Sequence, residues 1–155
     1  EKIAPFFITE ALDDHPLPLY GDGMQVRDWL YVDDHADAIE AVLERGAPGE
    51  IYNVGGEHEL HNIEVTRFIL EALNKPESLI RYVEDRPGHD RRYALTNDKI
   101  KRDLGWEPQH TFEDAMRQTV EWYRQNEWWW RKIKTGEYLE FYKAQYAERL
   151  ANAKS

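Results

Sequence analysis

An α/β fold is the class that this sequence predicts, and two features of its pattern predict it. Apolar residues recur at helical spacing in several segments, and short stretches rich in β-branched and aromatic residues, bounded by Gly or Pro, separate them. The 155 residues, 41% of them hydrophobic, are enough for one domain with a buried core. Three strands of about five residues each do not make a full-sized sheet, so we expect residues 1–155 to form one small mixed α/β domain.

The N-terminal part of the pattern starts with a helix. Residues 2–14 carry apolar side chains at helical spacing, with Pro5 in the first turn, where proline is tolerated. Residues 17–20 are expected to be extended because residues that precede proline avoid the helical region. The stretch 26–32 is typical of a strand, and Asp33-Asp34 then predicts the N-cap and first turn of a helix.

The remaining elements follow from the same signals. The pattern predicts, in order, a strand over 50–54, a helix capped by Asn62, a strand over 79–83, a helix from Asn97 to Leu104 that ends at Gly105, a long helix opened by a Thr111–Asp114 capping box, and a helical tail over 138–151.

Positive charge gathers in the segment that follows the last predicted strand, Asp85–Tyr93. Its nine residues include Arg86, His89, Arg91 and Arg92, although the chain has a net charge of -10. Pro87-Gly88 predicts a turn, and the planar guanidinium group matches phosphate oxygens in a two-point contact. The segment therefore predicts a phosphate site. The alternative is a solvated loop whose arginines pair with Asp85 and Asp90.

Arg27 is a second candidate anion ligand, because it interrupts an apolar strand. A cation there is costly unless it is paired. Its partner is Asp28, Asp33 or the anion of a ligand, and together with Arg86 and His89 it would hold a diphosphate. Tyr20, next to a Leu-Pro-Leu stretch, either offers a flat wall to a nucleobase or packs in the core.

Composition excludes several classes of function. The 30 Asp and Glu residues against 20 Lys and Arg argue against a polyanion such as DNA, which needs a broad basic face. No cysteine is present, so neither disulfides nor thiolate metal sites can form. No apolar run approaches 18 residues and no leader pattern begins the chain, so we expect a cytoplasmic protein.

Catalytic motifs are also missing from the sequence. Gly21-Asp22-Gly23 lacks the third glycine of the dinucleotide fingerprint, no tyrosine has a lysine four residues later, and the only serines are Ser78 and Ser155. His58 and His61 lie beside acidic residues in a polar loop, a pattern that only weakly indicates a metal, so we expect no metal site and no catalytic residue.

Trp128-Trp129-Trp130, with Trp122 shortly before, supply more aromatic surface than the modest core needs. One explanation is a packing partner outside this chain, and the other is a helix that buries two sides within the chain itself. Glu1-Lys2 is no initiator sequence and helical spacing begins at once, so the sequence also reads as a fragment of a longer chain.

Several motifs together resemble a known family. Tyr20–Gly23, Arg27–His35 and Tyr52–Gly56 look like the C-terminal half of the extended short-chain dehydrogenase/reductase enzymes that act on nucleotide sugars. The narrower motifs Asp85–Ala94, Leu104–Trp106 and Thr119–Tyr123 resemble the dTDP-glucose 4,6-dehydratase branch of that family. The resemblance extends from Glu1 to the neighbourhood of Tyr146.

The resemblance implies a lyase of deoxysugar biosynthesis built from two parts. An N-terminal Rossmann domain, absent from this chain, binds NAD and carries the catalytic residues, and the C-terminal part binds the dTDP portion of the substrate. The sugar is oxidised at C4 by NAD, water is eliminated across C5–C6, and the hydride returns to C6 to give dTDP-4-keto-6-deoxyglucose. The whole protein would be a homodimer, and this chain alone would be inactive.

The same resemblance implies a set of substrate contacts in this chain. They fall on Glu1, Lys2, Pro18, Leu19, Tyr20, Arg27, Asn53, Asp85, Arg86, Pro87, Gly88, His89 and Tyr146. Two other readings stay open from the sequence: an epimerase or decarboxylase of the same superfamily, and a non-catalytic module that associates with proteins through its Trp-rich helices.

Overall fold

A computed structural model describes residues 2–134 and 136–153 and confirms the α/β class. Its elements, in order, are α1 (Ile3–Leu12), β1 (Leu17–Tyr20), β2 (Val26–Asp28), α2 (Val32–Arg45), β3 (Glu59–His61), α3 (Asn62–Ala72), the 3-10 turn η1 (Glu77–Leu79), β4 (Ile80–Val83), β5 (Arg92–Tyr93), α4 (Asp98–Leu104), α5 (Phe112–Gln125), α6 (Glu127–Ile133) and α7 (Glu137–Ala151).

These elements group into two compact units, which are described separately. The first unit comprises Glu1–Gln25, His61–His89 and Arg117–Ser155, and the second comprises Val26–Leu60 and Asp90–Met116. The chain passes from one unit to the other several times, so each unit is assembled from segments that lie far apart in the sequence.

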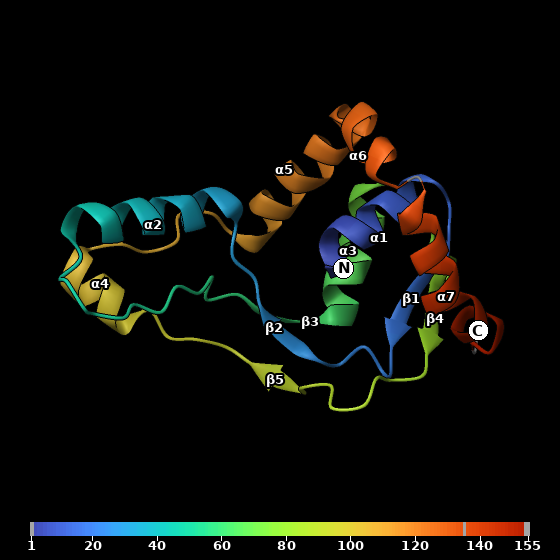
Figure 1. Cartoon of the computed structure of the whole chain (residues 1–155), viewed down its shortest axis with the longest axis horizontal. Coiled ribbons are helices and arrows are strands. Elements are labelled where there is room, and N and C mark those ends of the chain that lie inside the picture. The colour runs from blue at the N-terminus through green and yellow to red at the C-terminus, as the bar shows by residue number, and fades with distance from the viewer. Residues whose placement is uncertain (1, 135, 154–155) are drawn as a thin grey trace. The chain divides into compact units, whose positions relative to one another are not determined.

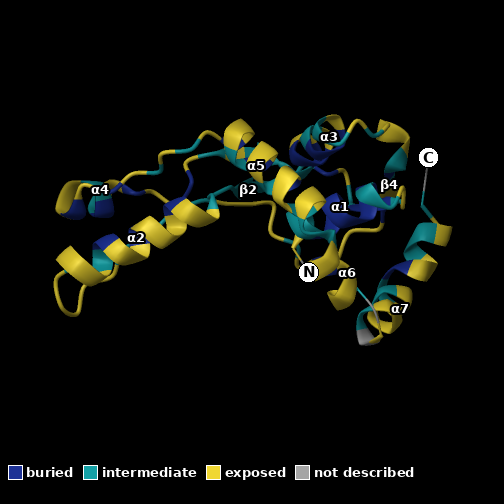
Figure 2. Cartoon of the chain, turned by 90° about the horizontal axis from the view of Figure 1, so that it is seen from above, coloured by how far each residue is buried: buried dark blue, intermediate teal, exposed yellow. Residues whose placement is uncertain are grey.

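A parallel pair of strands and two packed helices form the centre of the first unit (Figure 1). β1 and β4 pair in register from Leu17 opposite Ile80 to Tyr20 opposite Val83. Helix α1 packs against α3 and is largely buried, as the dark ribbon in Figure 2 shows. The fully buried side chains of this unit include Ile8, Leu17, Leu19, Ile69 and Leu70. Removing each of these apolar side chains from water stabilises the fold by about 1.5–3 kcal/mol.

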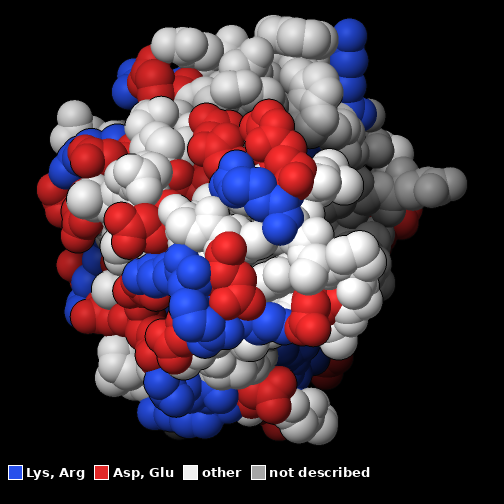
Figure 3. Space-filling view, turned by 90° about the vertical axis from the view of Figure 1, so that its left-hand side faces the viewer, with Lys and Arg blue, Asp and Glu red and all other residues white. Residues whose placement is uncertain are grey.

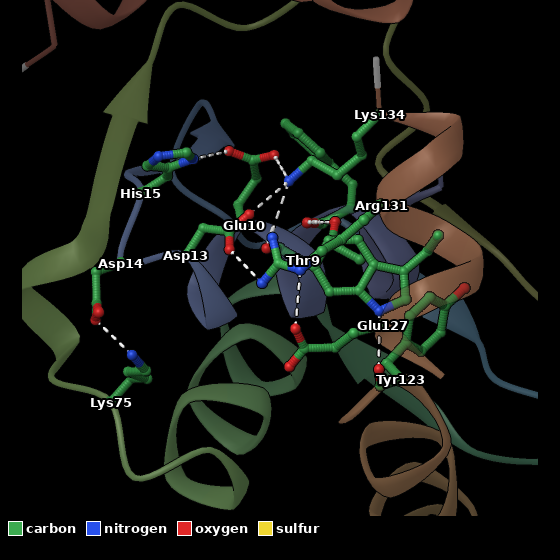
Figure 4. Close-up of polar contacts among 12 residues, drawn as sticks. Thr9, Glu10, Asp13, Asp14, His15, Lys75, Tyr123, Glu127, Arg131 and Lys134 are labelled. Carbon is green, nitrogen blue, oxygen red and sulfur yellow. Dashed lines mark hydrogen bonds and ion pairs between the residues drawn. The ribbon is translucent and has the colours of Figure 1, made fainter. Parts of the chain in front are cut away.

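Ion pairs tie the Trp-rich helix α6 to α1 within this unit (Figure 4). The buried carboxylate of Glu10 lies 2.6 Å from Lys134 Nζ, and Asp13 lies 2.9 Å from Arg131 Nη2. Trp130 is buried and its indole N–H donates to the Tyr123 carbonyl at 2.8 Å. Trp128 and Trp129 are 64% and 44% exposed. The tryptophan cluster is therefore buried on one side only.

The second unit contains a three-stranded sheet of order β3-β2-β5, in which Val26 of β2 lies opposite Arg92 of the parallel strand β5. Its core consists of Ala38, Ala41, Ile100, Leu104 and Trp106. Helix α2 is amphipathic, yet much of its apolar surface is not covered by this unit (Figure 2).

Charges of both signs are interleaved on the face that Figure 3 shows. In the second unit, for example, Lys99 pairs with Glu50 and Lys101 pairs with Glu57. On that face the Lys and Arg side chains form no broad basic surface of the kind that a polyanion needs.

The structure corrects three predictions about individual elements. The strand expected over 26–32 ends at Asp28, and helix α2 begins at Val32 with Tyr31 as its N-cap, two residues before the predicted cap at Asp33. Among the described residues, 50–54 are not part of any strand. They lack a neighbouring strand to pair with, and the Ile51 carbonyl instead accepts a hydrogen bond from Lys99 Nζ at 2.8 Å.

Other local predictions are confirmed, with one further correction. Helix α3 is capped by His61 rather than Asn62, because the Glu64 carboxylate accepts the His61 backbone N–H at 2.8 Å. Gly105 ends α4 in the left-handed region at φ 67°. Thr111 Oγ1 accepts the Asp114 N–H at 3.2 Å, as a capping box requires. Within the described residues no helix is long and apolar enough to cross a membrane.

Candidate functional site

A cluster of three side chains marks the candidate site of the first unit. Tyr20 ends strand β1, and Asp85 and His89 lie in the loop that follows β4. His89 Nδ1 lies 2.6 Å from Asp85 Oδ1, and the His89 ring stands edge-on to the Tyr20 ring at 6.1 Å. An ionised carboxylate only accepts hydrogen bonds, so His89 Nδ1 carries the hydrogen and Nε2 is the ring's second polar atom.

Gly21 and Gln25 explain why this cluster forms. The Gly21 N–H donates to the Val83 carbonyl at 2.9 Å, which extends the β1–β4 pairing up to the loop. Gly21 has φ 59°, and a Cβ on it would lie 2.9 Å from Asp85 Oδ2, so glycine permits both the turn and the close approach. Gln25 is 2% exposed and its Nε2 donates to Asp85 Oδ2 at 2.8 Å. The carboxylate is thus fixed from two sides.

The Asp85 carboxylate is ionised in this setting. Burial alone would raise its pKa, but hydrogen bonds from His89, from the Arg86 backbone N–H and from Gln25, together with the charge of His89, outweigh burial and hold the pKa below its ordinary value. The His89 side chain is 7% exposed. A buried imidazole held by a carboxylate is a rigid hydrogen-bonding group for a ligand.

Arg86 completes the predicted loop, together with Pro87 and Gly88. Gly88 has φ 68°, which confirms the turn. Only the backbone N–H of Arg86 contacts Asp85, at 2.9 Å, and the exposed guanidinium group has no partner among the described residues. The alternative of a loop neutralised by its own aspartates is therefore wrong for Arg86, and Arg92 pairs instead with Glu59, at 2.6 Å and 2.7 Å.

Arg27 belongs to the second unit and lies on β2. Its guanidinium group donates to the carbonyls of Val26 at 2.7 Å and Asp90 at 3.0 Å, and lies 4.1 Å from the centroid of the Tyr93 ring. Neither Asp28 nor Asp33 pairs with it within the described part of the chain, so the alternative of a nearby aspartate partner is wrong, and the alternative of a ligand anion stays a prediction. Carbonyls and a ring orient the cation without neutralising its charge, which leaves it able to bind an anion.

Asp28 has a structural role instead. Its carboxylate accepts the backbone N–H groups of Gly56 and His58, each at 3.0 Å. The buried Asn97 side chain makes two hydrogen bonds to the Gly55 backbone: its Oδ1 accepts the Gly55 N–H at 2.7 Å, and its Nδ2 donates to the Gly55 carbonyl at 2.8 Å. A Cβ on Gly56 would overlap the Trp29 carbonyl oxygen, so the Gly-Gly pair allows this segment to pack against the end of β2.

The other predicted contacts have varied surroundings. Asn53 is exposed in the second unit, and Lys2 is exposed in the first, where it lines an apolar cavity of about 240 Å³. Pro18, Leu19 and Tyr146 are buried. Glu1 lies outside the described residues. The first unit thus brings Tyr20, the Asp85–His89 loop and Tyr146 together, while Arg27 and Asn53 belong to the second unit.

The two histidines considered as metal ligands have protein partners. His58 Nε2 lies 3.1 Å from the His110 carbonyl, and His61 Nδ1 lies 3.0 Å from the Met24 carbonyl. Across the described ranges, 2–134 and 136–153, no group of three His, Cys, Asp or Glu side chains is placed to bind a metal ion.

Sequence reasoning missed Gln25, Asn97 and Arg149, whose side chains position others. Gln25 and Asn97 gave no signal, because their partners are 60 and 42 positions away. Arg149 could have been found, since it lies three residues after Tyr146 and therefore shares a helix face with it. Arg149 Nη1 lies 2.6 Å from the Tyr20 hydroxyl.

Solved structures of known proteins share the fold of this chain. The structure of dTDP-glucose 4,6-dehydratase from Bacillus anthracis in complex with NAD superposes with a TM-score of 0.81 and 50% identity, over 86% of this chain and 42% of that one. DesIV, a dTDP-glucose 4,6-dehydratase from Streptomyces venezuelae with NAD and TYD bound, gives a TM-score of 0.83 and 49% identity, over 86% and 41%. The fold is therefore that of the dehydratase and epimerase class of short-chain dehydrogenases/reductases.

Sequence comparison gives the family. The profile of the GDP-mannose 4,6 dehydratase family matches residues 1–119, and the chain belongs to this family. The dTDP-glucose 4,6-dehydratase of Neisseria meningitidis serogroup B is 51% identical over 149 residues, which are 89% of this chain and 42% of that protein. That of Escherichia coli is 49% identical over 89% and 41%. The chain spans about 42% of the length of these relatives and corresponds to their C-terminal part.

Proposed function

We propose that this chain is the substrate-binding part of a dTDP-glucose 4,6-dehydratase and that it binds the dTDP portion of the substrate. The whole enzyme would be an NAD-dependent lyase that oxidises the sugar at C4, eliminates water across C5–C6 and returns the hydride to C6. The chain itself would bind without catalysing, since it lacks a Tyr-x-x-x-Lys pair.

The observation that carries this proposal is the cluster of Tyr20, Asp85 and His89. A flat ring at the end of β1 lies beside a fixed imidazole, and the loop that carries this imidazole also carries the unpartnered Arg86 guanidinium. A ring can stack on a base, while a guanidinium group and Nε2 of an imidazolium ring donate to phosphate oxygens. These are the two chemistries that a nucleoside diphosphate presents.

Arg27 and Asn53, which belong to the second unit, are further ligands that we propose for the complete enzyme. Arg27 keeps its positive charge while carbonyls and the Tyr93 ring hold it in place. In the proposed enzyme it binds a phosphate oxygen of the diphosphate, and the exposed Asn53 amide supplies a further hydrogen bond.

The NAD of the solved relatives has no place on this chain's own residues. The Gly21–Gly23 turn lacks the third glycine and leads into strand β2 rather than into a helix, so it does not form a dinucleotide site. We therefore place NAD, and every reacting side chain, on the portion of the relatives that this chain does not span.

The uncovered apolar side chains of helix α2 support a packing partner of this kind. Val32, Ile39 and Leu43 are 68%, 51% and 82% exposed and recur at helical spacing. The extended segment 50–54, with Ile51 80% exposed, has no strand beside it in the described residues. A Rossmann half would cover the helix and supply a strand next to 50–54, and the complete enzyme would be a homodimer.

Nucleotide binding tests the proposal. The chain is joined to the N-terminal part of its Neisseria meningitidis relative and titrated calorimetrically with thymidine diphosphate. Binding is expected, and Arg27→Ala should weaken it by about 1 kcal/mol or more because a charge-assisted hydrogen bond is lost. Arg45→Ala is the matched control, because Arg45 is an exposed arginine of the same unit that pairs with Glu44.

Equal affinities of the wild-type protein and Arg27→Ala would remove Arg27 from the site. Absence of binding by the wild-type fusion, with circular dichroism that shows a folded protein, would refute the proposal as a whole. A folded, monomeric chain that does not bind nucleotides but binds other proteins through its exposed tryptophans would favour the protein-association reading instead.

An epimerase is the second candidate, because solved epimerases share the fold. The epimerase Mth375 of Methanothermobacter thermautotrophicus gives a TM-score of 0.80 at 32% identity over 85% of this chain and 40% of that one. Identity near 50% to dehydratases favours the first candidate. Product analysis of the fusion protein separates the two, since a 4-keto-6-deoxy sugar has lost water and an epimerised sugar has not.

A further inference from the structure

The last turns of helix α7 carry a cation with an unusual partner. Arg149 Nη1 donates to the hydroxyl oxygen of Tyr20 at 2.6 Å, and the guanidinium carbon lies 5.2 Å from the centroid of the Tyr20 ring. Gln145, one turn earlier, reaches the same hydroxyl at 3.4 Å. Two side chains of α7 therefore converge on one atom at the end of β1.

Several other cations of the first unit have carboxylate partners. Arg131 pairs with Asp13 at 2.9 Å, Arg67 with Glu77 at 3.1 Å, and Lys134 with Glu10 at 2.6 Å. Within the part of the chain that the structure describes, Arg149 has no such ion pair. A guanidinium group that contacts a neutral phenol loses hydration without being neutralised, so this contact is weak evidence for a purely stabilising role.

Helix α7 is held in place independently of Arg149. Tyr146 is buried and its ring stacks on that of Phe6 at 5.3 Å, while Tyr142 stands edge-on to Phe6 at 5.9 Å. These contacts fix α7 on α1, and Arg149 projects from that fixed helix towards Tyr20. The helix therefore serves as a rigid support for the contact.

The Tyr20 ring lies between two anchors. His89, which Asp85 holds, stands edge-on to the ring, and Arg149 binds its hydroxyl. Arg149 and Gly21, the chain neighbour of Tyr20, line an open cavity of about 530 Å³, and this volume is typical of small-molecule sites. A ring that is fixed before a ligand arrives loses less conformational entropy on binding.

We propose that Arg149 is a positioning residue, which fixes the Tyr20 ring as a stacking surface for the nucleobase. The inference rests on the proposed function, since it assumes that a nucleotide binds beside Tyr20. The charge of Arg149 acts on the phenol and not on the diphosphate. Loss of Arg149 should then weaken the binding of a nucleoside and the binding of its diphosphate by the same factor.

The test uses the fusion protein described above and two probes, thymidine and thymidine diphosphate. Arg149→Ala is expected to weaken the binding of both probes about fivefold. Tyr20→Phe, which keeps the ring but removes the hydroxyl, should have the same effect. The double variant should be no weaker than either single variant, because both remove one contact. Arg149→Lys, which keeps one donor, should recover part of the affinity.

Lys143→Ala on the exposed face of α7 is the matched control, and its affinity should equal that of the wild-type protein. The free energy of unfolding of Arg149→Ala should stay near that of Lys143→Ala, which separates positioning from general destabilisation. If Arg149→Ala does not fold, Arg149→Lys and Tyr20→Phe still test the contact, because both are small changes in volume.

Three outcomes overturn the inference. Unchanged affinity in Arg149→Ala and Tyr20→Phe would show that the contact does not serve binding. If Arg149→Ala weakened the binding of thymidine diphosphate but not of thymidine, or if its effect added to that of Tyr20→Phe, Arg149 would be a phosphate ligand. Failure of the wild-type protein to bind either probe would overturn the proposed function together with this inference, whereas normal wild-type binding with insensitive variants overturns this inference alone.

Discussion

Two aspartate–histidine pairs, one in each unit, share a geometry but differ in their surroundings. In the second unit Asp34 Oδ1 lies 2.9 Å from His110 Nδ1, and in the first Asp85 Oδ1 lies 2.6 Å from His89 Nδ1. The Asp34 side chain is 2% exposed and that of His110 31%, whereas the Asp85 side chain is 40% exposed and that of His89 7%. One pair buries its acid and the other buries its imidazole.

The backbone partners sharpen this difference. Asp34, in the first turn of α2, also accepts the backbone N–H groups of Gln109 and His110, each at 3.2 Å, and so fixes the segment before α5 to the helix. Asp85 accepts one backbone N–H, that of its neighbour Arg86, and a side chain from Gln25. The same chemical pair therefore joins two packed segments in one unit, whereas in the other it orients an imidazole at the proposed ligand site.

The largest expected effect is on stability and belongs to the second unit. Asp34→Ala leaves two backbone donors and an imidazole without their acceptor, which should lower the free energy of unfolding by about 3 kcal/mol. Urea unfolding of the chain measures it. Asp33→Ala is the matched control, since Asp33 is exposed in the same helical turn, and it should cost less than about 0.5 kcal/mol.

Equal losses in Asp34→Ala and Asp33→Ala would contradict a structural role for the buried pair. A loss in both near 3 kcal/mol would instead point to the acidic first turn of α2 and its interaction with the helix dipole.

Asp85→Ala should have the opposite profile. Its carboxylate is partly exposed, so we expect a cost of about 1 kcal/mol in stability, yet a weakening of thymidine diphosphate binding by about tenfold, because His89 loses its orientation. Urea unfolding and calorimetric titration of the fusion protein measure the two quantities. Asp90→Ala, an exposed aspartate one residue after His89, is the control and should change neither.

A tenfold loss of affinity with Asp90→Ala would show that negative charge in this segment, rather than the Asp85–His89 pair, governs binding. Unchanged affinity with Asp85→Ala would exclude this pair from the site and leave Arg86 as the candidate ligand of that loop.

Local chemistry made part of this site predictable. Pro87-Gly88 predicted the turn, and Gly105 and the Thr111–Asp114 box predicted helix ends, because each of these signals depends on residues that are adjacent in sequence. The cationic loop was recognisable for the same reason. Its orientation by Gln25 was not, since the two partners are 60 positions apart.

Predictions failed where the partner lies far along the chain. A nearby aspartate was one of two alternatives for the partner of Arg27, the other being a ligand anion, and in the structure Arg27 binds the Asp90 carbonyl, 63 positions away. The segment 50–54 has the composition of a strand, yet a strand exists only where a neighbour pairs with it, and the described residues provide none. The contact of Arg149 with Tyr20 spans 129 positions. Composition states what a segment can form, and the rest of the fold decides whether it does.

The smallest expected difference between the two pairs is in their response to acid. In both aspartates burial alone would raise the pKa, but hydrogen bonds, above all from His110 for Asp34 and from His89 for Asp85, outweigh burial and hold the pKa below its ordinary value of 3.8. Their contribution to stability is therefore complete above the unfolded pKa and is lost as the pH falls through the folded pKa. The free energy of unfolding should fall below about pH 4.

Replacing each carboxylate by an amide isolates its part of that fall, because an amide does not titrate. Asp34→Asn should flatten the acid limb by up to about 1.4 kcal/mol per pH unit, the limit for one proton, and Asp85→Asn should flatten it less, because solvent screens the exposed carboxylate. Urea unfolding at pH 3, 4, 5 and 6 measures both slopes. If Asp85→Asn flattened the acid limb more than Asp34→Asn, the pair at the candidate site, and not the buried one, would carry the electrostatic stabilisation. That result would reverse the structural and ligand-binding roles assigned to the two pairs.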